Sequence, residues 1–229
     1  MLDVLHNIDS QLFEVIHNLY RSPAVDSFFW MFTGRWTWVP FYASLAVMVF
    51  CIKPWPKALM MIAAIGIAVA LTDQTCASII RPMVARLRPS HPDNPLSAVV
   101  TTVNNYRGGN YGFPSCHAGN SFALATFIVL AFKHRVLVAT MFTWAIVNSL
   151  SRLYLGVHYP GDLIVGAIIG SLIGAACFAA WRAIAPRLPS HFNHHRAPSS
   201  SHPLVASARR LPSLVALATT LLIAILAHV

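Results

Sequence analysis

The chain has 229 residues, of which 56% are hydrophobic and only 10% are charged. A soluble domain carries about 25% charged residues, so this composition argues against an ordinary soluble enzyme and indicates a membrane protein. The net charge of +9 would suggest nucleic acid as the partner of a soluble protein. Here the basic residues gather in short loops between apolar runs, where they report membrane topology, and we expect no nucleic-acid partner.

Residues 1–35 are expected to form an interfacial helical segment. Apolar residues alternate with Asp, His, Asn and Glu over residues 1–20 at a spacing that predicts an amphipathic helix. Such a helix lies in the membrane interface or packs on a bundle, and Ser22-Pro23 ends it. The absence of a basic start and the presence of Asp3, Asp9 and Glu14 argue against a cleaved signal peptide.

Six apolar segments predict membrane helices further along the chain. Their ranges are 36–52, 58–80, 117–132, 136–155, 160–181 and 211–228. Several are shorter than the roughly 20 residues that a straight span needs, so we expect polar turns to extend them. The fold class predicted is therefore all-α, an integral membrane six-helix bundle preceded by the interfacial helix. Residues 36–182 hold the main bundle, 183–210 a flexible cytoplasmic loop, and 211–229 the C-terminal transmembrane helix.

Loop charges orient this bundle. If the six spans hold, one side receives most of the basic residues: Lys53, Lys57, Lys133, Arg135, Arg182, Arg187, Arg196, Arg209 and Arg210. The positive-inside rule makes that side the cytoplasm. The long loop 82–113 lies on the other side, and a loop of this length is usually functional.

The histidines in the loop 183–210 could suggest a metal site, but the sequence around them favours a flexible segment. His191, His194, His195 and His202 lie in low-complexity sequence without nearby carboxylates or cysteines. The four cysteines of the chain also lack a zinc spacing. We therefore expect no metal.

Three polar fragments interrupt the apolar sequence on the side away from the cytoplasm. They are Arg81-x6-Arg88-Pro89, Pro114-Ser115-Cys116-His117 and Ser151-Arg152-x5-His158-x3-Asp162. Charge beside lipid is costly and usually functional. Because all three fragments fall at matching helix ends, the sequence predicts that they form one site.

The first fragment suits phosphate binding. Arg81 and Arg88 are seven residues apart, so they share a face if the segment stays helical. Two guanidinium groups on one face can make bidentate contacts to phosphate oxygens. The alternative is a pair of interfacial arginines that extend toward the headgroups.

The second fragment precedes an apolar run and predicts a helix N-terminus, where free backbone N–H groups bind anions. Ser115 adds a hydroxyl donor, and His117 would lie beside the anion. Cys116 suggests a cysteine nucleophile of the Cys-x5-Arg kind. Phe122 occupies the arginine position, which argues against that mechanism.

The third fragment places His158 and Asp162 four residues apart, and Pro160 marks the first turn of a helix. A carboxylate on one ring nitrogen fixes the tautomer and makes the other nitrogen more basic. Arg152, near the end of the fourth span, belongs to the same layer. A purely structural His–Asp pair is the alternative.

Together the fragments resemble those of the type 2 phosphatidic acid phosphatase (PAP2) superfamily, whose pattern is Lys-x6-Arg-Pro, Pro-Ser-Gly-His and Ser-Arg-x5-His-x3-Asp. The resemblance implies a membrane bundle of the PAP2 and haloperoxidase type. It implies that His158 attacks phosphorus to form a phosphohistidine, that Asp162 orients His158, and that His117 protonates the leaving oxygen. The phosphate would be held by Arg81, Arg88, Ser115, Cys116 and Arg152. The resemblance implies no cofactor.

Two positions depart from the family pattern. Arg81 stands where lysine is usual, and Cys116 stands where glycine is usual. The charge at residue 81 is kept, and the Cys116 N–H can still donate if the backbone needs no positive φ there. We expect altered substrate fit rather than lost activity.

The resemblance predicts a hydrolase of lipid phosphates or diphosphates in the bacterial inner (cytoplasmic) membrane, with its site facing the periplasm or exterior. The compact chain is similar to undecaprenyl-diphosphate phosphatases, which makes undecaprenyl diphosphate the first substrate expected. Lipid A, phosphatidate and phosphatidylglycerophosphate are the alternatives. Vanadate-dependent haloperoxidases share the site, but they are soluble.

A transporter is the alternative of another class, suggested by Asp73, Gln74 and Asn148 within the spans. A transporter has no need of a His–Asp pair beside an arginine cluster. Gly166, Gly170 and Gly174 recur at four-residue spacing, which favours close helix packing either within the chain or in a homodimer.

Overall fold

The computed structural model describes residues 2–34, 36–187 and 203–228, and within these ranges the protein is all-α. The elements in chain order are α1 (Leu2–Asn18), α2 (Pro23–Phe32), α3 (Val39–Ile52), α4 (Trp55–Gln74), the π-helical turn η1 (Thr75–Ile80), α5 (Arg81–Val84), the 3-10 turn η2 (Pro95–Ala98), α6 (Cys116–Phe132), α7 (Arg135–Tyr154), α8 (Pro160–Ile184), the 3-10 turn η3 (Ala185–Arg187) and α9 (Pro203–Leu226).

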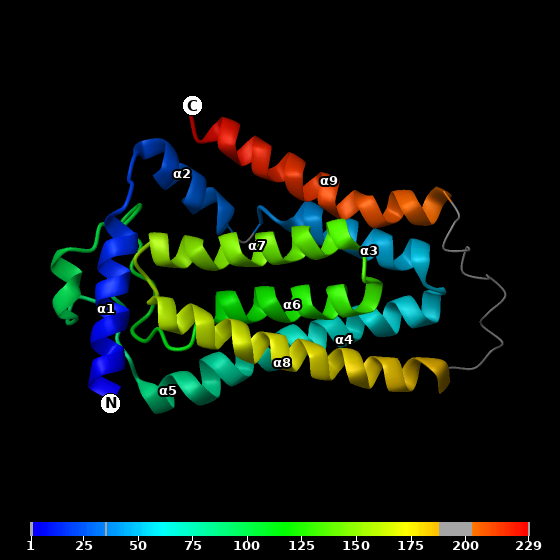
Figure 1. Cartoon of the computed structure of the whole chain (residues 1–229), viewed down its shortest axis with the longest axis horizontal. Coiled ribbons are helices and arrows are strands. Elements are labelled where there is room, and N and C mark those ends of the chain that lie inside the picture. The colour runs from blue at the N-terminus through cyan, green and yellow to red at the C-terminus, as the bar shows by residue number, and fades with distance from the viewer. Residues whose placement is uncertain (1, 35, 188–202, 229) are drawn as a thin grey trace.

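In the part of the chain that the structure describes, the six apolar helices α3, α4, α6, α7, α8 and α9 form the bundle. Helix α1 lies across one end of it (Figure 1). Among the described residues, four helical stretches are long and apolar enough to cross a membrane: Trp55–Val84, Arg135–Tyr154, Pro160–Arg187 and Pro203–Leu226. The other two, α3 and α6, are shorter apolar helices. The predicted all-α membrane bundle is confirmed, with two short members.

The short helix α6 contacts α4, α7 and α8. Its N-terminal end is set back from the neighbouring ends of α7 and α8 (Figure 1). Loop 85–115 and α1 lie at this same end of the bundle. The first two residues of α6, Cys116 and His117, line a cavity at this end of the bundle.

Small residues allow α8 to approach α6 closely. A Cβ atom on Gly166 or Gly170 would overlap the carbonyl oxygen of Ser115 or Gly119, respectively, and one on Gly174 would lie 2.5 Å from the oxygen of Ala123. All three glycines are buried against α6 of the same chain. They serve packing within the chain, which leaves the expected homodimer face without support.

The long helix of the second span bends before it ends. The π-helical turn η1 precedes Pro82, which has no N–H to donate, and Ala85 ends the helix in the left-handed region with φ of 48°. Arg88 therefore lies in the loop after the helix. Arg81 and Arg88 were expected to share a face only if the segment stayed helical, and the structure does not meet that condition.

The described helices extend into both ends of the range 183–210 that was predicted to be a loop. Helix α8 continues to Ile184, and α9 begins at Pro203. His191, His194, His195 and His202 lie outside the described residues.

Helix α1 packs on the end of the bundle, which is one of the two positions that its sequence allowed. Phe13 and His17 are each only 1% exposed where they pack on the bundle. Ile8, Leu12 and Val15 are exposed on its other side. The helix thus packs on the bundle end and leaves an apolar face free, and the interfacial position stays a prediction.

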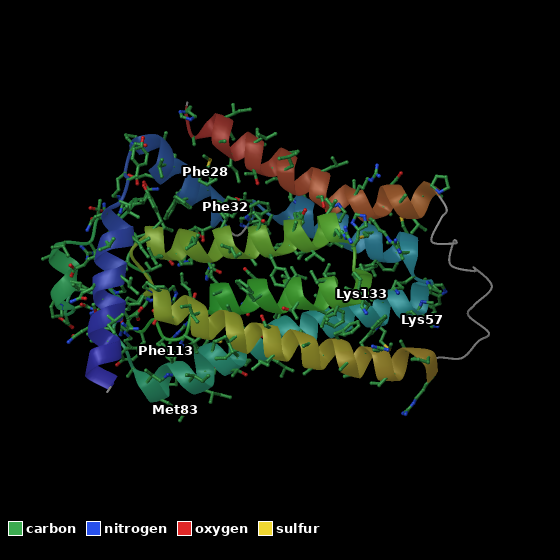
Figure 2. All side chains as sticks on the ribbon, viewed as in Figure 1. Phe28, Phe32, Lys57, Met83, Phe113 and Lys133 are labelled. Atoms are coloured by element: carbon green, nitrogen blue, oxygen red, sulfur yellow. The ribbon has the colours of Figure 1, made fainter. Side chains whose placement is uncertain are left out.

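The two ends of the bundle differ in charge and in structure. Lys57 and Lys133 lie at one end, and Met83 and Phe113 lie at the other (Figure 2). The first polar fragment contains Met83, and the second begins directly after Phe113, so these fragments lie at that end. The third fragment joins them there through His158 and Arg88. The fragments are therefore opposite the basic loops, as the topology prediction requires.

Candidate active site

His158 lies between α7 and α8, where Pro160 starts α8 at its first turn. Its Nε2 atom is 3.0 Å from Nη1 of Arg88, and its Nδ1 atom is 3.2 Å from Oδ2 of Asp162. A guanidinium only donates, so Nε2 must accept and the ring proton must lie on Nδ1. The arrangement leaves the Nε2 lone pair directed toward Arg88.

Asp162 is fully buried and holds three groups together. Oδ2 accepts from the backbone N–H of Tyr159 at 3.0 Å as well as from His158. Oδ1 accepts from Nη1 of Arg86 at 3.2 Å. The carboxylate therefore fixes the orientation of the His158 ring and the start of α8 together.

Arg86 and Asp9 complete this network, and neither was assigned a role from the sequence. Nη1 of Arg86 lies 2.6 Å from Oδ2 of Asp9, and Oδ1 of Asp9 accepts from the N–H of Gly161 at 2.7 Å. The guanidinium also covers the Tyr159 ring, 3.6 Å from its centroid. No local spacing joins Asp9 to Arg86, so only the fold brings them together.

Ser115 is the N-cap of α6. Its Oγ accepts from the N–H of Ala118 at 3.4 Å, and its own N–H donates to the backbone oxygen of Asp162 at 2.9 Å. The side chain is fully buried and is not part of the cavity wall. Ser115 therefore caps the helix and does not line the cavity, so its phosphate contact stays a prediction.

The two departures from the family pattern touch each other. Nη2 of Arg81 lies 2.9 Å from Sγ of Cys116 and 3.1 Å from the carbonyl oxygen of Pro114. Cys116 is the first residue of α6 and does not have a positive φ. The condition for cysteine at this position is therefore met.

Arg152 is held by two hydroxyl groups. Nη1 donates to Oγ1 of Thr33 at 3.1 Å, and Nη2 donates to the Tyr106 hydroxyl at 3.0 Å. The Arg152 side chain is almost completely buried. It approaches the site from α7, while Thr33 and Tyr106 come from the segment after α2 and from the long loop.

A cavity of about 930 Å³ connects these groups. Six of the eight predicted site residues line it: Arg81, Arg88, Cys116, His117, Arg152 and His158. Asp162 and Ser115 lie behind the wall. His117 is exposed to the cavity. The prediction of a single site from three fragments is thus matched by one cavity.

Clustered positive charge dominates the cavity wall. Burial, followed by the charges of Arg81 and Arg152, lowers the pKa of the Arg88 guanidinium to about 10. Burial, followed by the charges of Arg88, Arg152 and Arg81, holds the pKa of His158 well below its usual range. His158 is therefore neutral near pH 7, and the charge closest to it is the positive charge of the arginines.

Several buried donors of this cluster are unpaired among the described residues. The Nε–H groups of Arg81, Arg88 and Arg152 have no hydrogen-bond partner there. In the same ranges no group of three or more His, Cys, Asp or Glu side chains could hold a metal ion. Cationic donors around a neutral histidine suit a tetrahedral oxyanion such as phosphate.

Residues 57–185 match the PAP2 superfamily. The chain is 48% identical to a lipid A 4'-phosphatase of Bacteroides thetaiotaomicron, over 76% of this chain and 77% of that protein. It is 33% identical to a lipid A 4'-phosphatase of Porphyromonas gingivalis, over 76% of this chain and 72% of that protein.

Two solved structures share the fold. One is a transmembrane PAP2 type phosphatidylglycerolphosphate phosphatase from Bacillus subtilis, with a TM-score of 0.56 and 21% identity over 81% of this chain and 88% of that chain. The other is LpxE from Aquifex aeolicus, with a TM-score of 0.54 and 26% identity over 74% of this chain and 93% of that chain.

Fold and relatives define the class as a multi-pass, all-α membrane phosphatase acting on lipid phosphoesters. The chain belongs to the PAP2 superfamily, which confirms the family, the fold class and the enzyme class expected from the three fragments.

Proposed function

We propose that this protein removes the 4'-phosphate of lipid A, an acylated glucosamine phosphate, at the outer face of the bacterial inner membrane. Two relatives that cover most of the chain carry that activity in their names. Neither of these two relatives names undecaprenyl diphosphate, the substrate expected first from the sequence. It becomes the second candidate.

The observation that supports a lipid phosphate as the substrate is the distribution of polar and apolar residues along the cavity wall. Its polar end holds Arg81, Arg88, Arg152, His117 and His158, and its walls continue between α3, α4 and α6 to apolar residues such as Val49, Ile62 and Ile128. If a phosphate binds at the polar end, the lipid attached to it would lie along the apolar walls. This division is what a lipid phosphate requires and a soluble phosphate does not.

In the first half of the proposed reaction, phosphate oxygens draw the Arg88 guanidinium away from Nε2 of His158. The freed lone pair attacks phosphorus, so a P–N bond forms while the P–O bond to the sugar breaks. His117 gives its proton to the departing sugar oxygen. The three guanidinium groups stabilise the charge that builds on the phosphoryl oxygens.

In the second half, water attacks the phosphohistidine and gives its proton to His117. The P–N bond breaks, and inorganic phosphate leaves. Asp162 supports both halves because it keeps the Nδ1 proton of His158 in place. Each residue returns to its starting protonation state.

The outer-face orientation rests on loop charge. Lys57 and Lys133 lie at the end of the bundle opposite the site (Figure 2). Basic loops are retained in the cytoplasm, so the site would face the periplasm.

A phosphate-release assay on the purified protein tests the proposal. Lipid A, phosphatidate, phosphatidylglycerophosphate and undecaprenyl diphosphate serve as substrates, and mass spectrometry of the lipid A product shows which phosphate was lost. The expected result is loss of the 4'-phosphate by the wild type and no release by His158→Ala. Release that survives in His158→Ala would refute the mechanism, and lipid flux in vesicles without hydrolysis would favour the transporter.

A further inference from the structure

A carboxylate also lines the cavity that holds the arginine cluster. Asp73, in α4, is within a stretch long enough to span the membrane, where an ionisable side chain is costly and usually functional. Its Oδ1 atom accepts from Nδ2 of Asn120 in α6 at 3.0 Å, and Asn120 also lines the cavity. The proposed phosphoryl transfer uses neither residue.

The carboxylate of Asp73 is the acceptor that this pair offers to the cavity. Oδ1 of Asn120 is buried and has no hydrogen-bond partner among the described residues. Asp73 offers only carboxylate oxygens. A ligand that completes this pair must therefore bring a donor, such as a hydroxyl or an amide N–H.

The position of the pair relates it to the group next to the phosphate. Asn120 follows His117 by one turn on the same face of α6, a rise of about 4.5 Å along the helix axis. That offset corresponds to a group directly attached to the phosphate, such as one sugar ring. Acyl chains lie farther from the reacting phosphorus.

A second polar pair marks the same level. Nδ2 of Asn148 donates to Oγ of Ser121 at 2.7 Å, and both residues line the cavity. The next cavity residues along α6 are Leu124 and Ile128, which are apolar. The wall therefore changes from polar to apolar one turn further along α6 than these pairs. A bound lipid would have its headgroup on the polar side of this boundary and its acyl chains on the apolar side.

We propose that Asp73 and Asn120 form a sugar subsite that binds a hydroxyl or amide N–H on the ring bearing the scissile phosphate. This inference rests on the proposed function, which supplies a glucosamine ring with an amide and hydroxyl groups. The subsite discriminates among the candidate lipids. Phosphatidate offers ester oxygens, which are acceptors like Asp73, and a diphosphate places a second anion near the carboxylate.

Four purified proteins test the subsite: wild type, Asp73→Asn, Asn120→Ala and the control Gln74→Ala. Gln74 neighbours Asp73 in sequence, but it is exposed outside the cavity, where its Oε1 accepts from Ser78. The measurement is kcat/KM on lipid A, phosphatidate and undecaprenyl diphosphate. A melting temperature for each protein reports folding.

For lipid A, Asp73→Asn and Asn120→Ala are expected to lower kcat/KM by about ten- to a hundredfold, as lost hydrogen bonds to charged or buried groups do. Phosphatidate hydrolysis is expected to change less than about threefold, since phosphatidate offers no donor to the pair. Asp73→Asn is expected to raise kcat/KM for undecaprenyl diphosphate relative to kcat/KM for lipid A. Gln74→Ala should match the wild type on all three.

Equal losses on every lipid, together with lower melting temperatures, would overturn the subsite and make the pair an interhelical contact only. Unchanged lipid A kinetics in both variants would overturn it as well. Failure of the proposed function looks different, because the wild type itself would then leave lipid A intact while hydrolysing another lipid. That result overturns the subsite together with the function before any variant is compared.

Discussion

Arg86 and Asp9 form an ion pair, with Nη1 2.6 Å from Oδ2, that joins the N-terminal helix α1 to the loop beside His158. Both side chains are largely buried, at 15% and 14% exposure. The same guanidinium reaches Asp162 at 3.2 Å. Two residues, Arg86 and Asp162, therefore connect a helix with an exposed apolar face to the proposed nucleophile.

Replacing Arg86 with alanine is expected to lower kcat by up to about a hundredfold. The variant lacks one of the groups that hold Asp162, so Asp162 no longer fixes the His158 ring as well, and a misplacement of about 1 Å costs that much. KM should change little, since Arg86 does not line the cavity. Steady-state kinetics on lipid A measure both constants.

Arg182→Ala, at the opposite end of the bundle, is the matched control and should keep the wild-type kcat. A rise in KM at constant kcat in Arg86→Ala would mean that Arg86 binds substrate instead of positioning the His–Asp pair.

Arg81 and Cys116 are expected to be energetically coupled, because the guanidinium lies 2.9 Å from the sulfur. Arg81→Lys and Cys116→Gly each remove this contact, and the double variant has the usual family residues at both positions. Contacting residues couple by about 0.5–3 kcal/mol. A double-mutant cycle on kcat/KM is expected to give a value in this range, with the double variant more active than the product of the single effects predicts. Strict additivity would show that the two departures are independent.

His158 is expected to make the protein less stable in acid. Its pKa in the fold is well below the usual 6.5, so the native state binds fewer protons than the unfolded chain once the pH falls below about 6.5. Stability from this group is complete above that pH and declines as the pH falls below it. Buried His17, whose pKa is also lowered, acts in the same direction.

The measurement for His158 is the melting temperature of wild type and His158→Gln between pH 7.5 and about 5. The wild type should lose more stability than the variant, and His17 cancels in the difference. A parallel decline in both proteins would contradict a neutral buried His158.

Gly170→Ala is expected to destabilise the bundle by about 1–3 kcal/mol or more, because the added Cβ overlaps backbone of Gly119 that has no rotamer to change. Gly66→Ala is the control, since a Cβ there meets nothing within 4 Å. Thermal unfolding in detergent should show a lower melting temperature for Gly170→Ala, and an unchanged or higher one for Gly66→Ala. Normal stability in Gly170→Ala would mean that α6 and α8 can separate without cost.

Long apolar runs determined the helices by themselves. Backbone polar groups in lipid must be satisfied within the segment, so such runs have few alternatives to a helix. The pairing of His158 with Asp162 was equally accessible, because four residues at a proline-initiated helix start place them together without help from the rest of the chain.

Local spacing failed where the chain leaves regular structure. Arg81 and Arg88 seemed to share a helix, but Ala85 adopts a left-handed conformation and ends it. The three arginines nevertheless line one cavity, because the loop carries Arg88 back to His158. Sequence spacing cannot report such a return, since it depends on contacts across the fold.

Sequence alone thus determined the membrane helices, the family and the chemical groups of the site, because these depend on composition and on short motifs. Tertiary structure decided which groups meet. It turned Gly166, Gly170 and Gly174 toward α6, joined Asp9 to Arg86, and set Asp73 against Asn120 within the cavity. Those contacts join residues far apart in the chain, and only the packing of the helices determines them.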